Sequence, residues 1–142
     1  MWQACIHEKS PEMAVSPVAR PDYAAHARAV RASFPEVVAE LRTILGAKLC
    51  AYVGSVKETR AVNEWADGER EPSSDTQRRL RLALQIAQAI ADVDGPEVAR
   101  AWFQGLNPQL DDRSPARLIR EGEVDEVGPE VIAAERAFLV GG

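Results

Sequence analysis

The chain has 142 residues, of which 46% are hydrophobic and 27% charged, and its formal net charge at pH 7 is −5. This length and composition fit one compact domain, or two small ones that share a core, and exclude disorder throughout the chain. The acidity is concentrated near the end, because residues 83–142 carry eleven acidic and five basic side chains, whereas residues 36–82 carry eight of each. Affinity for nucleic acid must therefore come from a local arrangement of cations or from a dimer.

The cysteines predict a reduced protein without a metal site. Cys5 and Cys50 stand in different settings and neither has a CxxC partner. Because the start of the chain also lacks the apolar stretch of a signal peptide, we expect a cytoplasmic protein without membrane contact. Cys5 and His7 form an isolated pair and His26 stands alone, so we expect neither a metal nor another cofactor.

Helices are predicted from residue 22 onward. Residues 1–21 contain three prolines and no sustained periodicity, which indicates a mobile tail. From Asp22, apolar residues at positions 23, 27, 30 and 34 predict a first helix. Pro35 is placed to begin a second helix, with Ser33 or Phe34 just before it and a stop at Gly46.

Two short segments, "AKLCAYV" and "KETRAVNEWADG", are separated by a glycine turn and predict a helix-turn-helix that ends at Gly68. Val62 and Trp65 would pack inward. The residues left facing outward, which suit contacts with DNA bases, are Lys57, Thr59, Arg60 and Asn63. The alternative is an ordinary solvated face, which Glu58 and Glu64 favour.

The longest periodic run, residues 73–95, predicts a central helix packed on both sides. Pro96 begins the next helix, which carries Trp102 and Phe103, and we interpret Trp102 as a core residue rather than an interface anchor. Turn and cap signals follow at Asn107-Pro108, Ser114-Pro115 and Gly122. Asp111 and Asp112 are interpreted as a solvated turn. Because no catalytic motif is present, we expect a protein that is not an enzyme.

The last segment, "EVDEVGPEVIAAERAFLVGG", is acidic and ends in apolar residues, which suits a protein interface better than a nucleic-acid one. The Gly128-Pro129 pair is predicted to interrupt it, and a final helix is predicted to restart at Pro129. No segment alternates like a β-strand, so the predicted fold class is all-α.

The order of these motifs from about Val37 to Leu139 resembles that of the Xre/MbcA/ParS-type antitoxins. The resemblance rests on "VNEWADGEREP", "AWFQGLNPQL" and "SPARLIREGEVDEV" in this order and spacing. The positions that would specify the fold are Val62, Trp65, Gly68, Trp102, Asn107, Pro108, Ser114, Pro115, Leu118 and Gly122.

The resemblance implies an Xre-like helix-turn-helix bundle over residues 22–82 and a small helical toxin-binding domain over residues 83–142. It implies an antitoxin of a type II toxin–antitoxin system that occludes the active site of a RES-domain toxin, a partner that consumes NAD. The residues implied to bind the toxin are Val131, Ile132, Glu135, Arg136, Phe138, Leu139, Gly141 and Gly142. It also implies a homodimer that represses its own operon through operator DNA. The alternative is a stand-alone helix-turn-helix transcriptional regulator whose C-terminal part serves for dimerisation.

Overall fold

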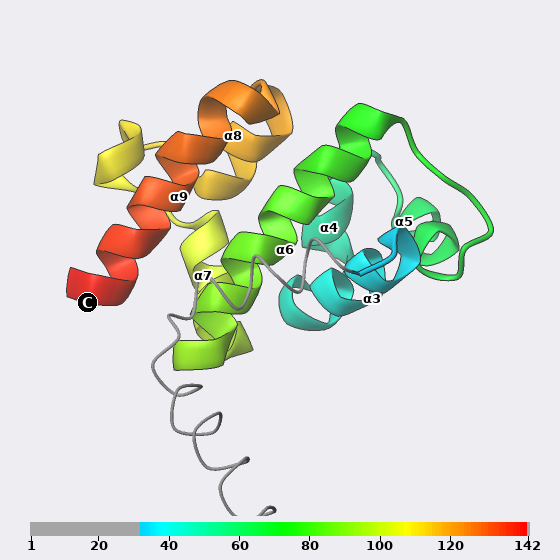
Figure 1. The fold of residues 1–142 in the computed structure, drawn as a ribbon, viewed down its shortest axis with the longest axis horizontal. Coiled ribbons are helices and arrows are strands. Elements are labelled where there is room, and N and C mark those ends of the chain that lie inside the picture. Colours follow the sequence, from blue (N-terminus) through cyan, green and yellow to red (C-terminus); the bar gives the residue numbers. More distant parts are fainter. Residues whose placement is uncertain (1–31, 142) are drawn as a thin grey trace, which may run out of the picture.

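The computed structural model describes residues 32–141, which form seven α-helices, one 3-10 helix and no strand (Figure 1). In chain order they are α3 (Phe34–Leu45), α4 (Ala47–Val53), α5 (Thr59–Ala66), α6 (Ser74–Asp94), α7 (Pro96–Gln104), η2 (Pro108–Leu110), α8 (Pro115–Glu121) and α9 (Val124–Gly141). The predicted all-α class is confirmed for these residues. Outside the described residues lie the predicted tail at 1–21 with Cys5 and His7, most of the helix predicted from Asp22, and Gly142.

Helix α6 is the centre of the fold. It contacts α3, α7 and α9, and α3 and α7 also contact each other. Figure 1 shows α3 and α9 on opposite sides of α6. Leu80, Leu84, Ile86 and Ile90 are all buried, as expected for a helix packed on both faces. The predicted domain boundary between residues 82 and 83 falls inside this helix. The two halves of the chain therefore share one hydrophobic core.

A capping box starts helix α3. The Ser33 backbone N–H donates to the Glu36 carboxylate at 2.9 Å, and the Ser33 hydroxyl accepts from the Glu36 N–H at 3.4 Å. The bond from the Ser33 N–H is the main reason that the pKa of Glu36 lies below its usual value. Phe34 therefore belongs to α3, where it is buried against Trp65, and not to the face of the helix predicted from Asp22.

Helix α9 runs without a break through Pro129, so the predicted interruption at Gly128-Pro129 is wrong. The proline removes the one N–H that would bond to the Asp125 carbonyl. Burial of the surrounding residues offsets this loss, since Gly128 is buried and a Cβ on it would lie 3.8 Å from Cδ2 of Leu82. An alanine would also fit at Gly128, because this distance is an ordinary van der Waals contact. The packing of α9 against α6 therefore keeps the helix continuous.

Candidate functional site

The residues implied to bind the toxin divide between two faces of α9. Val131 and Glu135 are fully buried and face the core, where they cannot contact a partner in this conformation. Arg136 and Gly141 are exposed. Ile132, Phe138 and Leu139 are half-buried at the edge of the core. The outward face of α9 is therefore the part available to another protein.

Trp102 lies at the edge of the core and joins α7 to α9. Its ring makes an edge-to-face contact with Phe103, at a centroid distance of 5.6 Å, and a tilted contact with Phe138, at 6.3 Å. Phe103 is fully buried, whereas Trp102 is half-buried. Trp102 therefore packs against the edge of the core, while its neighbour Phe103 takes the fully buried position.

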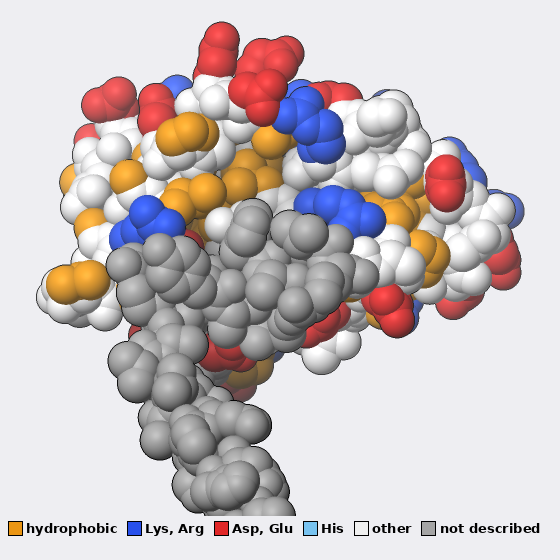
Figure 2. All heavy atoms as spheres, viewed as in Figure 1, with side chains coloured by type: hydrophobic (Ala, Val, Ile, Leu, Met, Phe, Trp, Pro, Cys, Tyr) orange, Lys and Arg blue, Asp and Glu red, His pale blue; other side chains and the backbone are white. Residues whose placement is uncertain are grey.

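Two adjoining cavities, of about 290 and 480 Å³, open beside this aromatic cluster. We call them together the α7–α9 cleft, and the residues that line both cavities are Trp102, Leu106, Asn107 and Phe138. Leu106 is 73% exposed at the rim, and Val140 on the last turn of α9 is 88% exposed. Figure 2 shows hydrophobic side chains at the surface on the α9 side of the molecule and acidic side chains along the edge nearest α8.

Local turn and cap bonds shape the chain between α7 and α8. The Asn107 side chain accepts from the Gln109 N–H at 2.9 Å and so caps η2, which begins at Pro108. The Ser114 hydroxyl accepts from the Arg117 N–H at 3.2 Å and caps α8. The bond to Asn107 fixes the turn at the rim of the α7–α9 cleft, because Leu106 directly precedes Asn107.

Asp111 and Asp112 follow η2 and are exposed with positive φ, a turn conformation that aspartate tolerates.

Other residues of the predicted fold-specifying set lie at helix ends or in the core. Val62, Trp65, Pro115 and Leu118 are buried, while Gly68 follows α5 and Gly122 follows α8.

The predicted helix pair is present as α4 and α5, joined by residues 54–58. Helix α5 begins at Thr59, two residues later than predicted, so Lys57 lies in the connection and not on the helix. Arg60 and Asn63 are exposed on α5, and Thr59 is half-buried at its start.

Two of these outward side chains already have partners within the chain. Arg60 Nε pairs with Glu64 at 3.1 Å, and Arg42 Nη1 donates to the Asn63 side-chain oxygen at 2.8 Å. Hydrogen bonds from Arg70 and then Arg60 hold the pKa of Glu64 below its usual value. Arg60 Nε and the Asn63 side-chain oxygen are thus engaged within the chain, and a base contact through either atom would replace these bonds.

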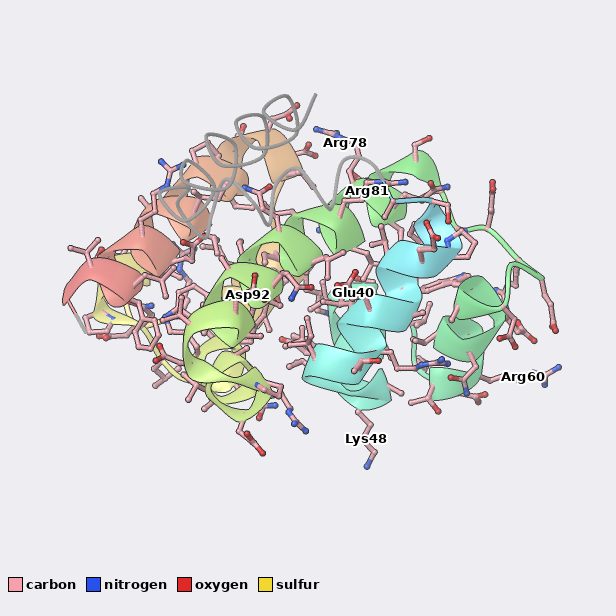
Figure 3. All side chains as sticks on the ribbon, turned by 60° about the horizontal axis from the view of Figure 1, so that its bottom comes forward. Glu40, Lys48, Arg60, Arg78, Arg81 and Asp92 are labelled. Atoms are coloured by element: carbon pink, nitrogen blue, oxygen red, sulfur yellow. The ribbon has the colours of Figure 1, made fainter. Side chains whose placement is uncertain are left out.

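A groove of about 710 Å³ lies between α4, the start of α5 and α8. We call it the cationic groove, because its lining includes Lys48, Lys57, Arg60 and Arg120. In Figure 3 the Lys48 and Arg60 side chains extend outward from α4 and α5. Sequence reasoning missed Lys48, although it lies four residues before Tyr52, another lining residue, on the same helix face. Nothing in the sequence near α4 or α5 indicates that Arg120 lines this groove, because Arg120 comes from the distant helix α8.

Metal and membrane sites are not found in the described part of the chain. No group of three or more His, Cys, Asp or Glu side chains within residues 32–141 is arranged to hold a metal ion. None of the helices α3 to α9 is long and apolar enough to cross a membrane. The features that stand out there are the α7–α9 cleft and the cationic groove.

Comparison with known proteins places the chain beside one group of antitoxins. No family model matches it. It is 34% identical over 68 residues to the mycobacterial cidal antitoxin MbcA of Mycobacterium tuberculosis and of Mycobacterium bovis. That match covers 48% of this chain, which thus spans 60% of the length of these curated relatives.

A solved structure extends the likeness over more of the chain. A chain in the crystal structure of the M. tuberculosis MbcT–MbcA toxin–antitoxin complex matches with a TM-score of 0.58 and 25% identity. The match covers 75% of this chain and 96% of the other. Sequence and fold agree, and the protein is a distant homologue of the antitoxin MbcA.

Proposed function

We propose that the chain is an antitoxin that binds a RES-domain toxin and covers its active site. Its homology to MbcA and its similarity to a chain of the MbcT–MbcA complex support this function. The observation on this chain that carries the proposal is the α7–α9 cleft, whose surroundings expose Leu106 and Val140. Exposed apolar side chains beside a groove are typical of protein-interaction surfaces.

In this proposal the toxin contacts the outward face of α9 and the rim of the α7–α9 cleft. The contacts on α9 are Ile132, Arg136, Phe138, Leu139, Gly141 and Gly142. Val131 instead holds α9 against the bundle, and Glu135, one turn further along the same face, is buried and so does not contact the toxin. Exposed acidic side chains lie at the corner between α8 and α9 and on the first turns of α9: Glu121, Glu123, Asp125, Glu126 and Glu130. Because Glu121 pairs with Arg117 and Asp125 with Arg78, the other three favour a partner whose facing surface is basic.

The inhibition is steric, so the chain needs no catalytic group and no cofactor of its own. Apolar anchors supply the affinity, since fully burying a leucine side chain contributes about 1.5–3 kcal/mol. Leu106 is suited to this role because most of its side chain is exposed in the free protein. The reaction on NAD would belong to the toxin alone.

The test is co-expression with the product of the adjacent reading frame, with growth and cellular NAD as readouts. Leu106→Asp combined with Val140→Asp places two charges on the proposed interface, and we expect loss of rescue and of co-purification. Val93→Asp is the matched control, because Val93 is also an exposed apolar residue, at 51%, but lies on α6 and not on α9 or in the lining of the α7–α9 cleft.

Removal of only residues 140–142 is a second arm of this test. A deletion from Pro129 onward would remove the buried Val131 and Ala134 and so unfold the bundle. If the double variant and the short deletion both fold and still restore growth and NAD, occlusion through this surface is wrong.

DNA binding through α4 and α5 is a second candidate function, either for autoregulation of the operon or for a stand-alone regulator. It is favoured by the exposure of Lys57, Arg60 and Asn63 beside the cationic groove. Salt-dependent binding to the upstream DNA, lost in Arg60→Ala combined with Asn63→Ala, would support it. A stand-alone regulator would bind DNA and yet fail to rescue cells from the neighbouring gene product.

We place the proposed antitoxin in the cytoplasm, as the cysteine pattern predicts, and expect a homodimer, as the family resemblance implies. Light scattering of the purified full-length chain tests the dimer, and a monomeric mass at concentrations that neutralise the toxin would contradict it.

A further inference from the structure

The cationic groove draws its charge from three separate parts of the chain. Lys48 comes from α4, Lys57 and Arg60 from the connection and first turn of α5, and Arg120 from α8. Glu58 is the acidic side chain in the same lining. A chain with a net charge of −5 thus gathers four cations around one groove. Such a local cluster attracts anions even when the whole protein is acidic.

Arg120 is fixed in this groove by Tyr52. Its Nη1 donates to the Tyr52 carbonyl oxygen at 2.7 Å, and its Cζ lies 4.6 Å from the centroid of the Tyr52 ring. A guanidinium has five N–H donors in a rigid fork and stacks on aromatic faces. The contacts with Tyr52 therefore orient the group and leave other donors for a ligand.

The cations of the groove differ in how strongly they are neutralised within the chain. The ion pairs found among residues 32–141 involve Arg60, Arg70, Arg78, Arg79, Arg113 and Arg117. Lys48, Lys57 and Arg120 are not among them. Arg117, one turn before Arg120 on the same helix, pairs with Glu121 at 3.2 Å and does not line the groove.

We propose that the cationic groove binds phosphate groups of duplex DNA and that Arg120 contributes a phosphate contact from outside the helix-turn-helix. The inference rests on the proposed DNA binding and extends its interface from α4 and α5 to α8. A guanidinium can bind two phosphate oxygens at once, which suits a contact that fixes the register of the protein on the duplex.

The exposure of the cations favours a DNA backbone over a single enclosed phosphate. Lys48, Lys57 and Arg60 are exposed, and Arg120 is half-buried. Successive phosphates of a DNA backbone can each contact one of these exposed cations. A small anion would instead need an enclosed pair of donors, which the lining of this groove does not provide. Helix α8 also packs against α9, so the same short helix would border the DNA face and the proposed toxin face.

The test is fluorescence anisotropy of the full-length protein with a labelled duplex from its own upstream region, over a series of chloride concentrations. We expect Arg120→Gln to weaken binding and to reduce the slope of log affinity against log salt by about 0.9, the value for one lost phosphate contact. Arg120→Lys keeps the charge and should keep the slope. Arg117→Gln is the matched control on the same helix and should bind like the wild type.

The outcomes separate this inference from the function on which it rests. If the wild type binds no duplex even at low salt, DNA binding itself fails and the inference with it. If the wild type binds and folded Arg120→Gln retains the wild-type slope, Arg120 makes no phosphate contact although DNA binding stands. Inorganic phosphate is added at matched ionic strength as a further arm. If it displaces the duplex far better than chloride does, the groove is a site for a small anion and the inference is overturned.

Discussion

Gly122 and Val127 pack so closely at the corner between α8 and α9 that a Cβ on Gly122 would lie 2.3 Å from Cγ1 of Val127. This Cβ on Gly122 would also lie 3.0 Å from the Leu118 carbonyl oxygen. Neither neighbour can move freely, because one is a β-branched side chain buried in the core and the other is helix backbone. The corner that sets the direction of α9 therefore depends on glycine at this position.

Gly122→Ala should lower the free energy of unfolding by about 1–3 kcal/mol, the usual cost of forcing an extra methyl group into a packed site. Urea denaturation followed by circular dichroism measures the loss. Gly141→Ala is the control, since a Cβ on Gly141 has no other atom within 4 Å. Equal stability of the two variants would contradict the close approach at the corner.

Pro129→Ala should stabilise the protein by about 1–3 kcal/mol. The substitution restores an N–H donor for the Asp125 carbonyl inside α9, and alanine is the more favourable residue in a helix interior by about 3 kcal/mol. Part of this gain is lost because alanine gives the unfolded chain more freedom. Thermal or urea unfolding tests the prediction. A destabilised variant would mean that the proline ring itself makes contacts that α9 requires.

The helix boundaries could be predicted from the sequence wherever the signal is local. Ser114 with Pro115 begins α8, Pro96 begins α7 and Gly46 ends α3, as their neighbours along the chain indicate. A cap needs only a side chain and an N–H three residues away, so the pattern and its physical cause lie in the same short segment. The central position of α6 was equally predictable, because its apolar face is wider than one neighbour could cover.

The candidate sites depend on contacts between distant residues, which no local pattern contains. Arg120 meets Tyr52 across 68 positions of sequence, so nothing near either residue predicts the cationic groove. On α9, Val131 and Ile132 are equally apolar, and only the packing of α9 against the other helices decides that Val131 faces inward. Leu106 directly precedes the Asn107-Pro108 turn signal, and nothing in that signal predicts that the Leu106 side chain is exposed beside Trp102.

The capping box of α3 should make stability depend on pH through Glu36. Because its pKa is lowered in the folded state, Glu36 stabilises the fold above its unfolded pKa of about 4.5, and this contribution is lost as the pH falls. Glu36→Ala should therefore be less stable than the wild type at pH 7, and the difference should shrink as the pH falls below 4.5. Urea unfolding of both proteins across this range is the measurement. Glu40→Ala removes a carboxylate of the same helix outside the capping box and is the control.

Cys50 should destabilise the fold in alkali. Burial raises the pKa of its thiol from 9.0 to about 12, and the charge of Arg42 opposes only part of that rise. In the unfolded chain the thiol ionises above pH 9.0, while the folded state still holds the proton, so stability falls as the pH rises through this window. The slope of the free energy of unfolding against pH from this one thiol approaches about 1.4 kcal/mol per pH unit.

The variant Cys50→Ala lacks this thiol but keeps the other titrating side chains. The stability of the wild type relative to Cys50→Ala should therefore decline between about pH 9 and pH 11 in urea unfolding. A constant difference over that range would mean that the Cys50 thiol ionises as readily in the folded protein as in the unfolded chain.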